Sequence, residues 1–288
     1  RLIVMTIAIF ANPLRPETFR EMKHVVQYLQ DKQIHVVLSH ELHNEPYGRD
    51  FASLNEYVSK CNEPIDFAIS IGGDGTFLTT ASIIGHLNIP ILGINCGHLG
   101  FLADVETSNT ETILEQLINQ QYTIEKRSML EVSCSVIEKI PAPYALNEVA
   151  ILKQGLNSMI SVETYMNGEY LHTYKADGLL IATPTGSTAY NLSVGGPLLS
   201  PHARALVLSP IATHSLSVRP LVIPDDAAID MKINSRNGNY MISIDGRSQV
   251  LSDDITLHVE RSQRTIKLVQ LLEHSFVNSL KNKLGWGK

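Results

Sequence analysis

Residues 66–76 read DFAISIGGDGT, an apolar run that ends in three glycines placed around one carboxylate. Apolar runs of this length are typical of strands that are covered on both faces of a sheet. The next apolar residues, Phe77, Leu78, Ala81 and Ile84, recur at helical spacing. The stretch therefore predicts a buried strand, a glycine-rich loop and a helix, and open α/β sheets bind ligands at that end of a strand.

The loop formed by Gly72, Gly73, Asp74 and Gly75 has the composition of a phosphate site with an acid at its centre. Glycines let backbone N–H groups approach a phosphate, and the start of the next helix adds partial positive charge. A carboxylate repels a phosphate there unless it binds the accompanying Mg²⁺ or accepts the proton of the attacking hydroxyl, and both roles belong to phosphoryl transfer. The loop is neither a Walker A motif nor a dinucleotide fingerprint. The alternative is a tight turn in which Asp74 only caps the helix.

The net charge and the cysteines of the chain indicate which partners it can bind and in which cellular compartment it works. The 288 residues carry a net charge of −6, which argues against nucleic acid or an anionic membrane as the main partner. The apolar residues 1–10 are too few to span a bilayer. Three separated cysteines, Cys61, Cys96 and Cys134, fit neither a disulfide framework nor a zinc site, and they indicate a reducing, cytoplasmic compartment.

Hydrophobic patterning predicts two domains with different architectures. Residues 1–105 alternate apolar strands with amphipathic helices, which is typical of a parallel, Rossmann-like α/β domain. Residues 106–270 predict a mainly antiparallel β domain, because the hairpin pair Asn-Gly lies at 167–168 and 237–238 between alternating runs. We expect a third hairpin from 255 to 268.

The C-terminal segment, residues 271–288, contains a short amphipathic helix. Ser275 can cap its start, and Phe276, Leu280 and Leu284 fall on one face. A helix this short is not stable by itself. We therefore expect it to dock, with its apolar face and Trp286 removed from water.

Three later stretches carry polar residues at expected strand ends. Asn147-Glu148 stands at the start of an apolar run, and Asp177 stands just before another at 179–182. An amide suits the edge of a base, and a carboxylate suits a pair of ribose hydroxyls. Residues 183–193, TPTGSTAYNLS, are too rich in hydroxyl groups for a plain core strand. Taken alone, these stretches are also consistent with turns and with a hydroxyl-rich loop that caps a helix.

Together these motifs resemble those of NAD kinases. The GGDGT loop at 72–76, Asn147-Glu148, Asp177-Gly178 and TPTGSTAY at 183–190 occur in the order and at about the spacing of that family, and the resemblance extends from about Met5 to Trp286. The first motif is shared with diacylglycerol and sphingosine kinases, whereas the later ones are specific to NAD kinases. The resemblance implies the two-domain architecture of that family, with segment 271–288 packed on domain 1–105 and NAD bound by domain 106–270.

The resemblance also implies an activity: transfer of the terminal phosphoryl group of ATP to the 2′-hydroxyl of the adenosine ribose of NAD, giving NADP. Asp74 would be the catalytic base. Mg²⁺ would accompany ATP without a dedicated cage of protein ligands, and a homodimer or homotetramer is expected. Two alternatives stay open, a lipid kinase that shares the loop and a non-catalytic NAD-binding sensor.

The residues expected to bind the nucleotides are those that match family motifs. Lys175 departs from the pattern, because bacterial relatives often have Arg there and Lys cannot reproduce a guanidinium fork. The full set is Gly72, Gly73, Asp74, Gly75, Asn147, Glu148, Lys175, Asp177, Thr185, Thr188, Ala189, Tyr190, Asn191, Leu192, Ser193, Ala212, Asp245 and Arg247.

Overall fold

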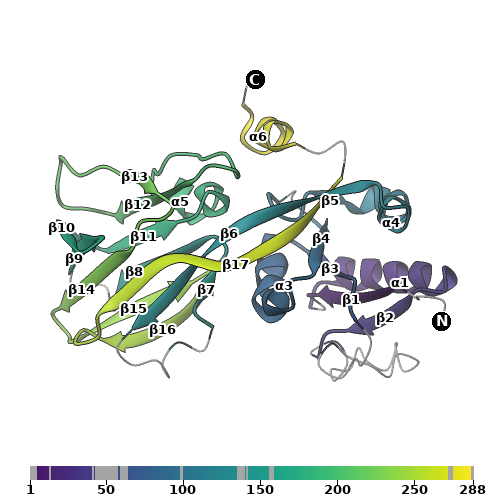
Figure 1. Ribbon diagram of the computed structural model, residues 1–288, viewed down its shortest axis with the longest axis horizontal. Coiled ribbons are helices and arrows are strands. Elements are labelled where there is room, and N and C mark those ends of the chain that lie inside the picture. The colour runs from purple at the N-terminus through teal and green to yellow at the C-terminus, as the bar shows by residue number, and fades with distance from the viewer. Residues whose placement is uncertain are drawn as a thin grey trace. The chain divides into compact units, whose positions relative to one another are not determined.

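The computed structural model describes residues 5–12, 14–40, 42, 58, 64–97, 100–134, 140, 142–155, 159–271 and 275–286. The chain forms two compact units, residues 1–126 with 266–288 and residues 127–265 (Figure 1). None of the helices in the described ranges has the length and hydropathy needed to cross a membrane.

A parallel sheet forms the centre of the first unit. Its strands are β1 (Thr6–Ala11), β2 (His35–Leu38), β3 (Phe67–Gly72), β4 (Pro90–Asn95), β5 (Val105–Glu106) and the end of β17 (Leu257–Leu271). The order is β17-β4-β3-β1-β2, with β5 beside β4. Every residue of β3 is buried, which accounts for its unbroken apolar run. This sheet confirms the predicted Rossmann-like α/β domain.

Helices in the described ranges connect these strands or follow β5. They are α1 (Pro16–Asp31), α3 (Asp74–Ile84) and α4 (Thr110–Ile118), with short 3₁₀ turns η3 (Gly85–Leu87) and η4 (Thr107–Asn109). Met22, Val25 and Leu29 of α1 are fully buried in one core with Ile69 of β3. Most of the 40–64 stretch, for which the pattern predicts a loop and a short helix, lies outside the described residues.

The second unit contains an antiparallel sheet of six strands. Its order is β13 (Leu221–Pro224), β12 (Ala205–Ile211), β11 (Gly178–Ala182), β8 (Glu148–Lys153), β15 (Asn239–Ile244) and β16 (Arg247–Ser252). All five residues of β11 are buried. The ends of β8 and β11 carry the residues that the sequence singles out, so this pair of strands positions the predicted nucleotide site.

A second group of strands completes this unit. β10 (Glu169–Ala176), β9 (Ile160–Met166), β14 (Ile229–Ser235) and β17 are neighbours, and β6 (Tyr122–Cys134) pairs with β17 and with β7 (Tyr144–Ala145). Ile151, Ile181, Val162 and Ile229 from the two groups share one core. The mainly antiparallel architecture of the later chain is confirmed.

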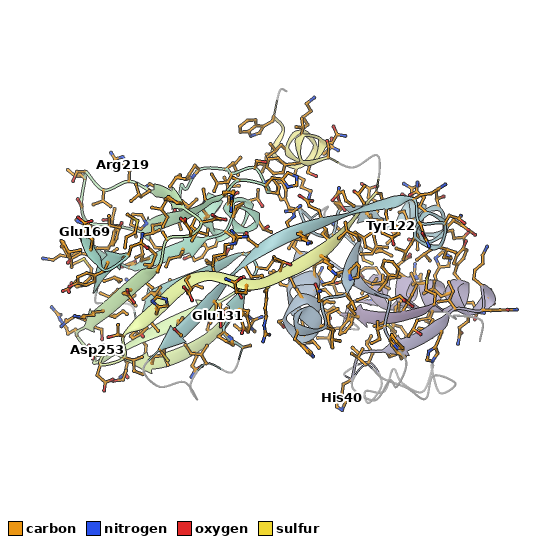
Figure 2. All side chains as sticks on the ribbon, in the orientation of Figure 1. His40, Tyr122, Glu131, Glu169, Arg219 and Asp253 are labelled. Carbon is orange, nitrogen blue, oxygen red and sulfur yellow. The ribbon has the colours of Figure 1, made fainter. Side chains whose placement is uncertain are left out.

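Of the three predicted hairpins, only the first forms. β9 and β10 pair across Asn167-Gly168, both of which have positive φ. At 237–238 the chain also turns, but β14 pairs with β9 and β17, whereas β15 pairs with β8 and β16. Asp253, labelled in Figure 2, holds this turn by accepting a hydrogen bond from the Ser235 backbone N–H at 3.0 Å. The second prediction is therefore wrong, because the turn joins strands of two different sheets.

The third predicted hairpin is also wrong. Residues 257–271 form one continuous strand, β17, and the hairpin that does form nearby joins β15 to β16. Its two turn residues are Asp245 and Gly246, with φ of 48° and 80°. Two consecutive positive φ angles are the signature of the tight hairpin turn that suits the twist of a sheet.

The first compact unit extends past residue 105, where the sequence pattern places the boundary. Ile113, Leu114 and Leu117 of α4 lie in the same core as α1, which groups residues 106–126 with the first unit. At the other end, Lys267 and Leu268 of β17 pair with β4. The C-terminal helix α6 (Phe276–Leu284) belongs to this unit too. That the second unit binds the dinucleotide stays a prediction.

Candidate active site

The glycine-rich loop lies between β3 and α3 in the first unit. Gly72 ends the strand with φ of 157°, and a Cβ there would lie 2.3 Å from Thr76 Oγ1, so a larger residue cannot replace it without displacing Thr76. A Cβ on Gly73 or Gly75 would meet nothing within 4 Å. Because the first N–H groups of a helix have no intrahelical partner, this open space lies beside available donors.

Asp74 does not cap α3. Its carboxylate accepts backbone N–H hydrogen bonds from Phe101 at 2.8 Å, Leu102 at 2.9 Å and Ala103 at 3.0 Å. A Cβ on Gly100 would lie 1.9 Å from Asp74 Oδ1. The carboxylate is therefore clamped by the chain segment that follows β4, and the interpretation of Asp74 as a simple helix cap is wrong.

These three hydrogen bonds leave the Asp74 carboxylate able to accept only one further proton or hydrogen bond. A carboxylate offers about four lone-pair directions, and three hydrogen bonds use most of them. The remaining direction can accept one proton or one hydrogen bond. The chain can approach Asp74 this closely because Gly100 has no side chain, and that glycine is the signal in the sequence for this contact.

Glu148 and Asp245 meet at the start of β8 in the second unit. Asp245 accepts the backbone N–H groups of Leu146 at 2.6 Å, Asn147 at 2.8 Å and Glu148 at 3.1 Å. Burial, and then the negative charge of Asp245, raise the pKa of Glu148 to about 7, and a hydrogen bond from the Tyr190 backbone N–H opposes this shift. Burial also raises the pKa of Asp245. A titrating carboxyl close to Tyr190 is thus built into this end of the sheet.

Residues 183–193 contain the 3₁₀ turn η6 (Thr185–Thr188) and the short helix α5 (Tyr190–Ser193), and they pack against the residues just before β8. Thr183 Oγ1 donates to the Leu146 carbonyl at 2.6 Å, and a Cβ on Gly186 would lie 2.0 Å from the Asn147 carbonyl oxygen. Close packing of this hydroxyl-rich segment thus keeps the Asn147-Glu148 motif and η6 together.

Some side chains of this segment are buried and hold the loop, whereas others are exposed to solvent. Asn191 is fully buried, donates to the carbonyls of Ser187 and Pro197, and accepts from Ser209 Oγ at 2.7 Å. Tyr190, by contrast, is 38% exposed and available to a ligand. The Asn191 side chain therefore holds the loop, whereas the contacts predicted for Thr188, Ala189, Leu192 and Ser193 stay predictions.

Two basic residues lie at this same end of the sheet. Arg247 Nη2 donates to the Tyr144 carbonyl at 2.8 Å. Arg127, which no motif indicates, is buried, and its Nη1 donates to Thr185 Oγ1 at 3.4 Å. A buried guanidinium beside a hydroxyl-rich turn is a functional candidate that sequence spacing alone does not reveal.

Lys175, Asp177 and Ala212 gather at the opposite end of β11. Lys153 Nζ lies 2.8 Å from Asp177 Oδ1, the Asp177 N–H donates to the Ile211 carbonyl, and the His214 N–H donates to the Lys175 carbonyl. Glu148 pairs with Ala182, so roughly 17 Å of strand separates it from Asp177, at ~3.3 Å per residue. The structure therefore does not bring these two carboxylates together within one chain.

Within this second group, Ala212 has a positive φ angle. Its φ is 48°, which is uncommon for a residue with a Cβ. Such strained residues concentrate at functional sites. The predicted role of Ala212 in a nucleotide pocket stays a prediction, and this backbone angle is consistent with it.

Comparison with known proteins decides the family. Residues 7–122 match the ATP-NAD kinase N-terminal domain, and residues 146–271 match the ATP-NAD kinase C-terminal domain. The chain belongs to the ATP-NAD kinase family. An NAD kinase of Bacteroides fragilis is 42% identical over 287 residues, covering 98% of both chains. An NAD kinase of Porphyromonas gingivalis is 48% identical over 226 residues, covering 78% of this chain and 77% of its own.

Solved structures of NAD kinases share the fold. An NAD kinase from Archaeoglobus fulgidus in complex with ATP has a TM-score of 0.74 at 27% identity, covering 96% of this chain and 98% of that chain. Yeast NADH kinase complexed with NADH has a TM-score of 0.84 at 24% identity, covering 99% of this chain and 89% of that one, which shows the fold alone. The predicted two-domain NAD kinase architecture is confirmed.

Family membership confirms the activity that the motifs imply. The ATP-NAD kinase family catalyses ATP-dependent phosphorylation of NAD, so this chain is a transferase, and the lipid-kinase and sensor alternatives are not supported. The roles of individual residues in this NAD kinase stay predictions.

Proposed function

We propose that in this NAD kinase the loop at 72–75 binds the donor phosphates and that Asp74 accepts the proton of the attacking 2′-hydroxyl. The supporting observation is the Asp74 carboxylate, which three backbone N–H groups hold at the start of α3 beside two open glycines. Phosphoryl transfer depends mainly on alignment and charge neutralisation. A base that is already immobilised loses little further freedom when the reactants arrive.

We propose that Mg²⁺ enters as part of the donor, MgATP. The described residues contain no group of three His, Cys, Asp or Glu side chains able to hold a metal ion. Phosphate oxygens and water supply most ligands of Mg²⁺ in nucleotide-dependent enzymes. When bound with ATP, the ion would supply positive charge against the transferred phosphoryl group, and the protein's own residues would align the acceptor hydroxyl.

The dinucleotide is proposed to bind at the end of β8 where Glu148, Tyr190 and Asp245 gather. Glu148 Oε2 is buried and has no hydrogen-bond partner among the described residues, so a ribose hydroxyl would satisfy it. The exposed ring of Tyr190 offers a flat face to a base. The Asp245 carboxylate accepts the backbone N–H groups of Asn147 and Glu148, and this fixed backbone supports a preformed site there.

We further propose a cytoplasmic homodimer or homotetramer. Lys175, Asp177 and Ala212 match the same family pattern as Glu148, yet they lie at the far end of the strand pair. A second copy of the chain could bring its Asp177 to the Glu148 of the first, since symmetric interfaces exchange contacts reciprocally. The separated pairs of polar residues thus support an oligomer in which two chains complete each nucleotide site.

An acceptor assay tests the proposed function. Purified protein with ATP, Mg²⁺ and NAD should form NADP, whereas diacylglycerol and sphingosine should remain unphosphorylated, because polar groups built for a dinucleotide would be left unpaired by a lipid. Parallel reactions with NADH and with polyphosphate measure the redox and donor preferences. Lipid phosphorylation without NADP formation would contradict the proposal.

A further inference from the structure

Lys283 occupies an unusual place for a lysine near the end of a helix. Helix α6 begins at the cap Ser275, which accepts the Asn278 N–H at 3.2 Å, and ends at Gly285, with φ of 66°. A lysine in the last turn normally extends into water, where it complements the helix dipole. Here the amine is buried, and Nζ lies 4.0 Å from the centroid of the Phe101 ring.

The contact places the Lys283 ammonium beside the catalytic loop. The backbone N–H of Phe101 donates to Asp74 Oδ2. Burial is the main influence on Lys283 and lowers its pKa to about 8, while the negative charges of Asp74 and Asp104 oppose that shift. The ring of Phe101, the carboxylate of Asp74 and the ammonium of Lys283 thus belong to one cluster within the first unit.

The amine of Lys283 lacks hydrogen-bond acceptors in the part of the chain that the structure describes. Nζ has no hydrogen-bond partner among the described residues, although an ammonium carries three N–H donors. Burying a charged group without hydrogen bonds costs free energy that an arriving anion would recover. The proposed donor site also needs a cation, because the Asp74 carboxylate by itself repels a phosphate.

We propose that Lys283 binds the terminal phosphate of the donor nucleotide. The inference rests on the proposed binding of donor phosphates at residues 72–75. It gives the C-terminal helix a role in the reaction: α6 delivers a cation to the side of the loop where the phosphoryl group is transferred. The competing interpretation is a purely structural one, in which Lys283 ties α6 to Asp74 and Phe101.

Two variants and a matched control separate these interpretations. Lys283→Met removes the charge and keeps an apolar chain over Phe101, and Lys283→Arg keeps the charge. Lys281→Met makes the same change on the same helix at an exposed position. Calorimetry with the full chain, Mg²⁺ and a non-hydrolysable ATP analogue measures donor binding, and steady-state kinetics measures KM for ATP and for NAD.

If Lys283 binds the donor, its substitution should reduce affinity for ATP and leave affinity for NAD nearly unchanged. Lys283→Met should weaken binding of the analogue and raise KM for ATP by about tenfold or more, the usual scale for a charge-assisted hydrogen bond, while KM for NAD stays within about twofold. Lys283→Arg should retain most of the affinity, and Lys281→Met should match wild type. The melting temperature of Lys283→Met without ligand should be unchanged or raised, because an unsatisfied buried charge has been removed.

The pH dependence supplies a readout that a structural role would not produce. Analogue affinity of wild type should fall as pH rises above about 8, as the ammonium loses its proton, whereas Lys283→Arg should lack this decline because a guanidinium stays charged. Unchanged analogue affinity in Lys283→Met, or a lower melting temperature with normal affinity, would overturn the inference. If wild type binds the analogue through Lys283 but forms no NADP, the proposed function fails and the binding role stands.

Discussion

At the scale of single residues, the role proposed for Asp74 as the base makes a direct prediction. Asp74→Asn should lower kcat by on the order of 10² or more while NAD affinity stays within a few-fold, because loss of a base affects the transition state more than the ground state. Asp66→Asn is a matched control: Asp66 directly precedes β3 at its opposite end, where it accepts the Thr6 N–H at 2.8 Å. Equal kcat in Asp74→Asn and wild type would remove Asp74 from the mechanism.

Gly100→Ala separates the position of the Asp74 carboxylate from its charge. The added methyl group would lie 1.9 Å from Oδ1, so the carboxylate must move although its chemistry is intact. Displacement of a catalytic group by about 1 Å can cost on the order of 10² in rate. If Gly100→Ala folds normally and keeps full activity, the clamp has no catalytic importance.

Glu148 should make stability depend on pH. Its pKa of about 7 in the folded chain lies above the ordinary value of 4.5, so the folded state retains a proton that the unfolded chain releases in that window. The group therefore lowers stability as pH rises from about 4.5 to 7. Glu148→Gln should be more stable than wild type at pH 8 by on the order of 1–3 kcal/mol.

Urea titrations at pH 4 and pH 8 measure this effect. The difference between Glu148→Gln and wild type should vanish at the lower pH, where both side chains are neutral. Glu169→Gln provides a control at an exposed position on β10, labelled in Figure 2. If Glu148→Gln raises the free energy of unfolding equally at both pH values, titration of Glu148 is not the cause.

At the scale of elements, sequence patterns predict the first unit well and the β connections poorly. The run at 66–71 and the helical spacing after Phe77 are local signals, and β3 and α3 follow them. The Asn237-Gly238 pair correctly indicates a turn, but a turn does not state which neighbours its two strands acquire. Strand pairing depends on residues distant in sequence: β14 pairs with β9 and β17, and β15 pairs with β8 and β16.

Deletion from Ser275 onward should destabilise the first unit. Phe276, Leu280 and Leu284 of α6 are half-buried, so their loss should lower the free energy of unfolding by on the order of 2–4 kcal/mol. Trp286 is 57% exposed, which corrects the expectation that it leaves the solvent. Trp286→Ala is therefore a control that should change stability by less than about 0.5 kcal/mol. An unchanged melting temperature after the deletion would mean that α6 does not support the fold.

At the scale of the whole molecule, the sequence identifies most candidate residues but not their grouping. Motif order indicates Glu148 and Asp177 as members of one nucleotide site. Their positions at opposite ends of β8 and β11 depend on the antiparallel register, which pairs Glu148 with Ala182 and Leu152 with Gly178. Arg127 and Lys283 carry no motif, and only the folded chain places one beside Thr185 and the other beside Phe101.

This grouping makes a prediction about mixed oligomers. Glu148→Ala and Asp177→Ala should each weaken NAD binding by on the order of 1–3 kcal/mol, because each leaves polar groups of the ligand unpaired. If a site uses Glu148 of one chain and Asp177 of another, a mixed dimer has one intact site and one doubly altered site. Random exchange of chains should then restore about a quarter of wild-type activity.

The mixing experiment needs an oligomer that can exchange its chains. Equal amounts of the two variants are unfolded together, refolded and assayed at an NAD concentration where each variant by itself has little activity. Light scattering on the same sample gives the number of chains in the particle. Because each chain by itself holds Glu148 and Asp177 roughly 17 Å apart along the strand pair, only sharing between copies predicts recovery. Activity equal to the mean of the separate variants would show that each chain binds NAD without a residue from its partner.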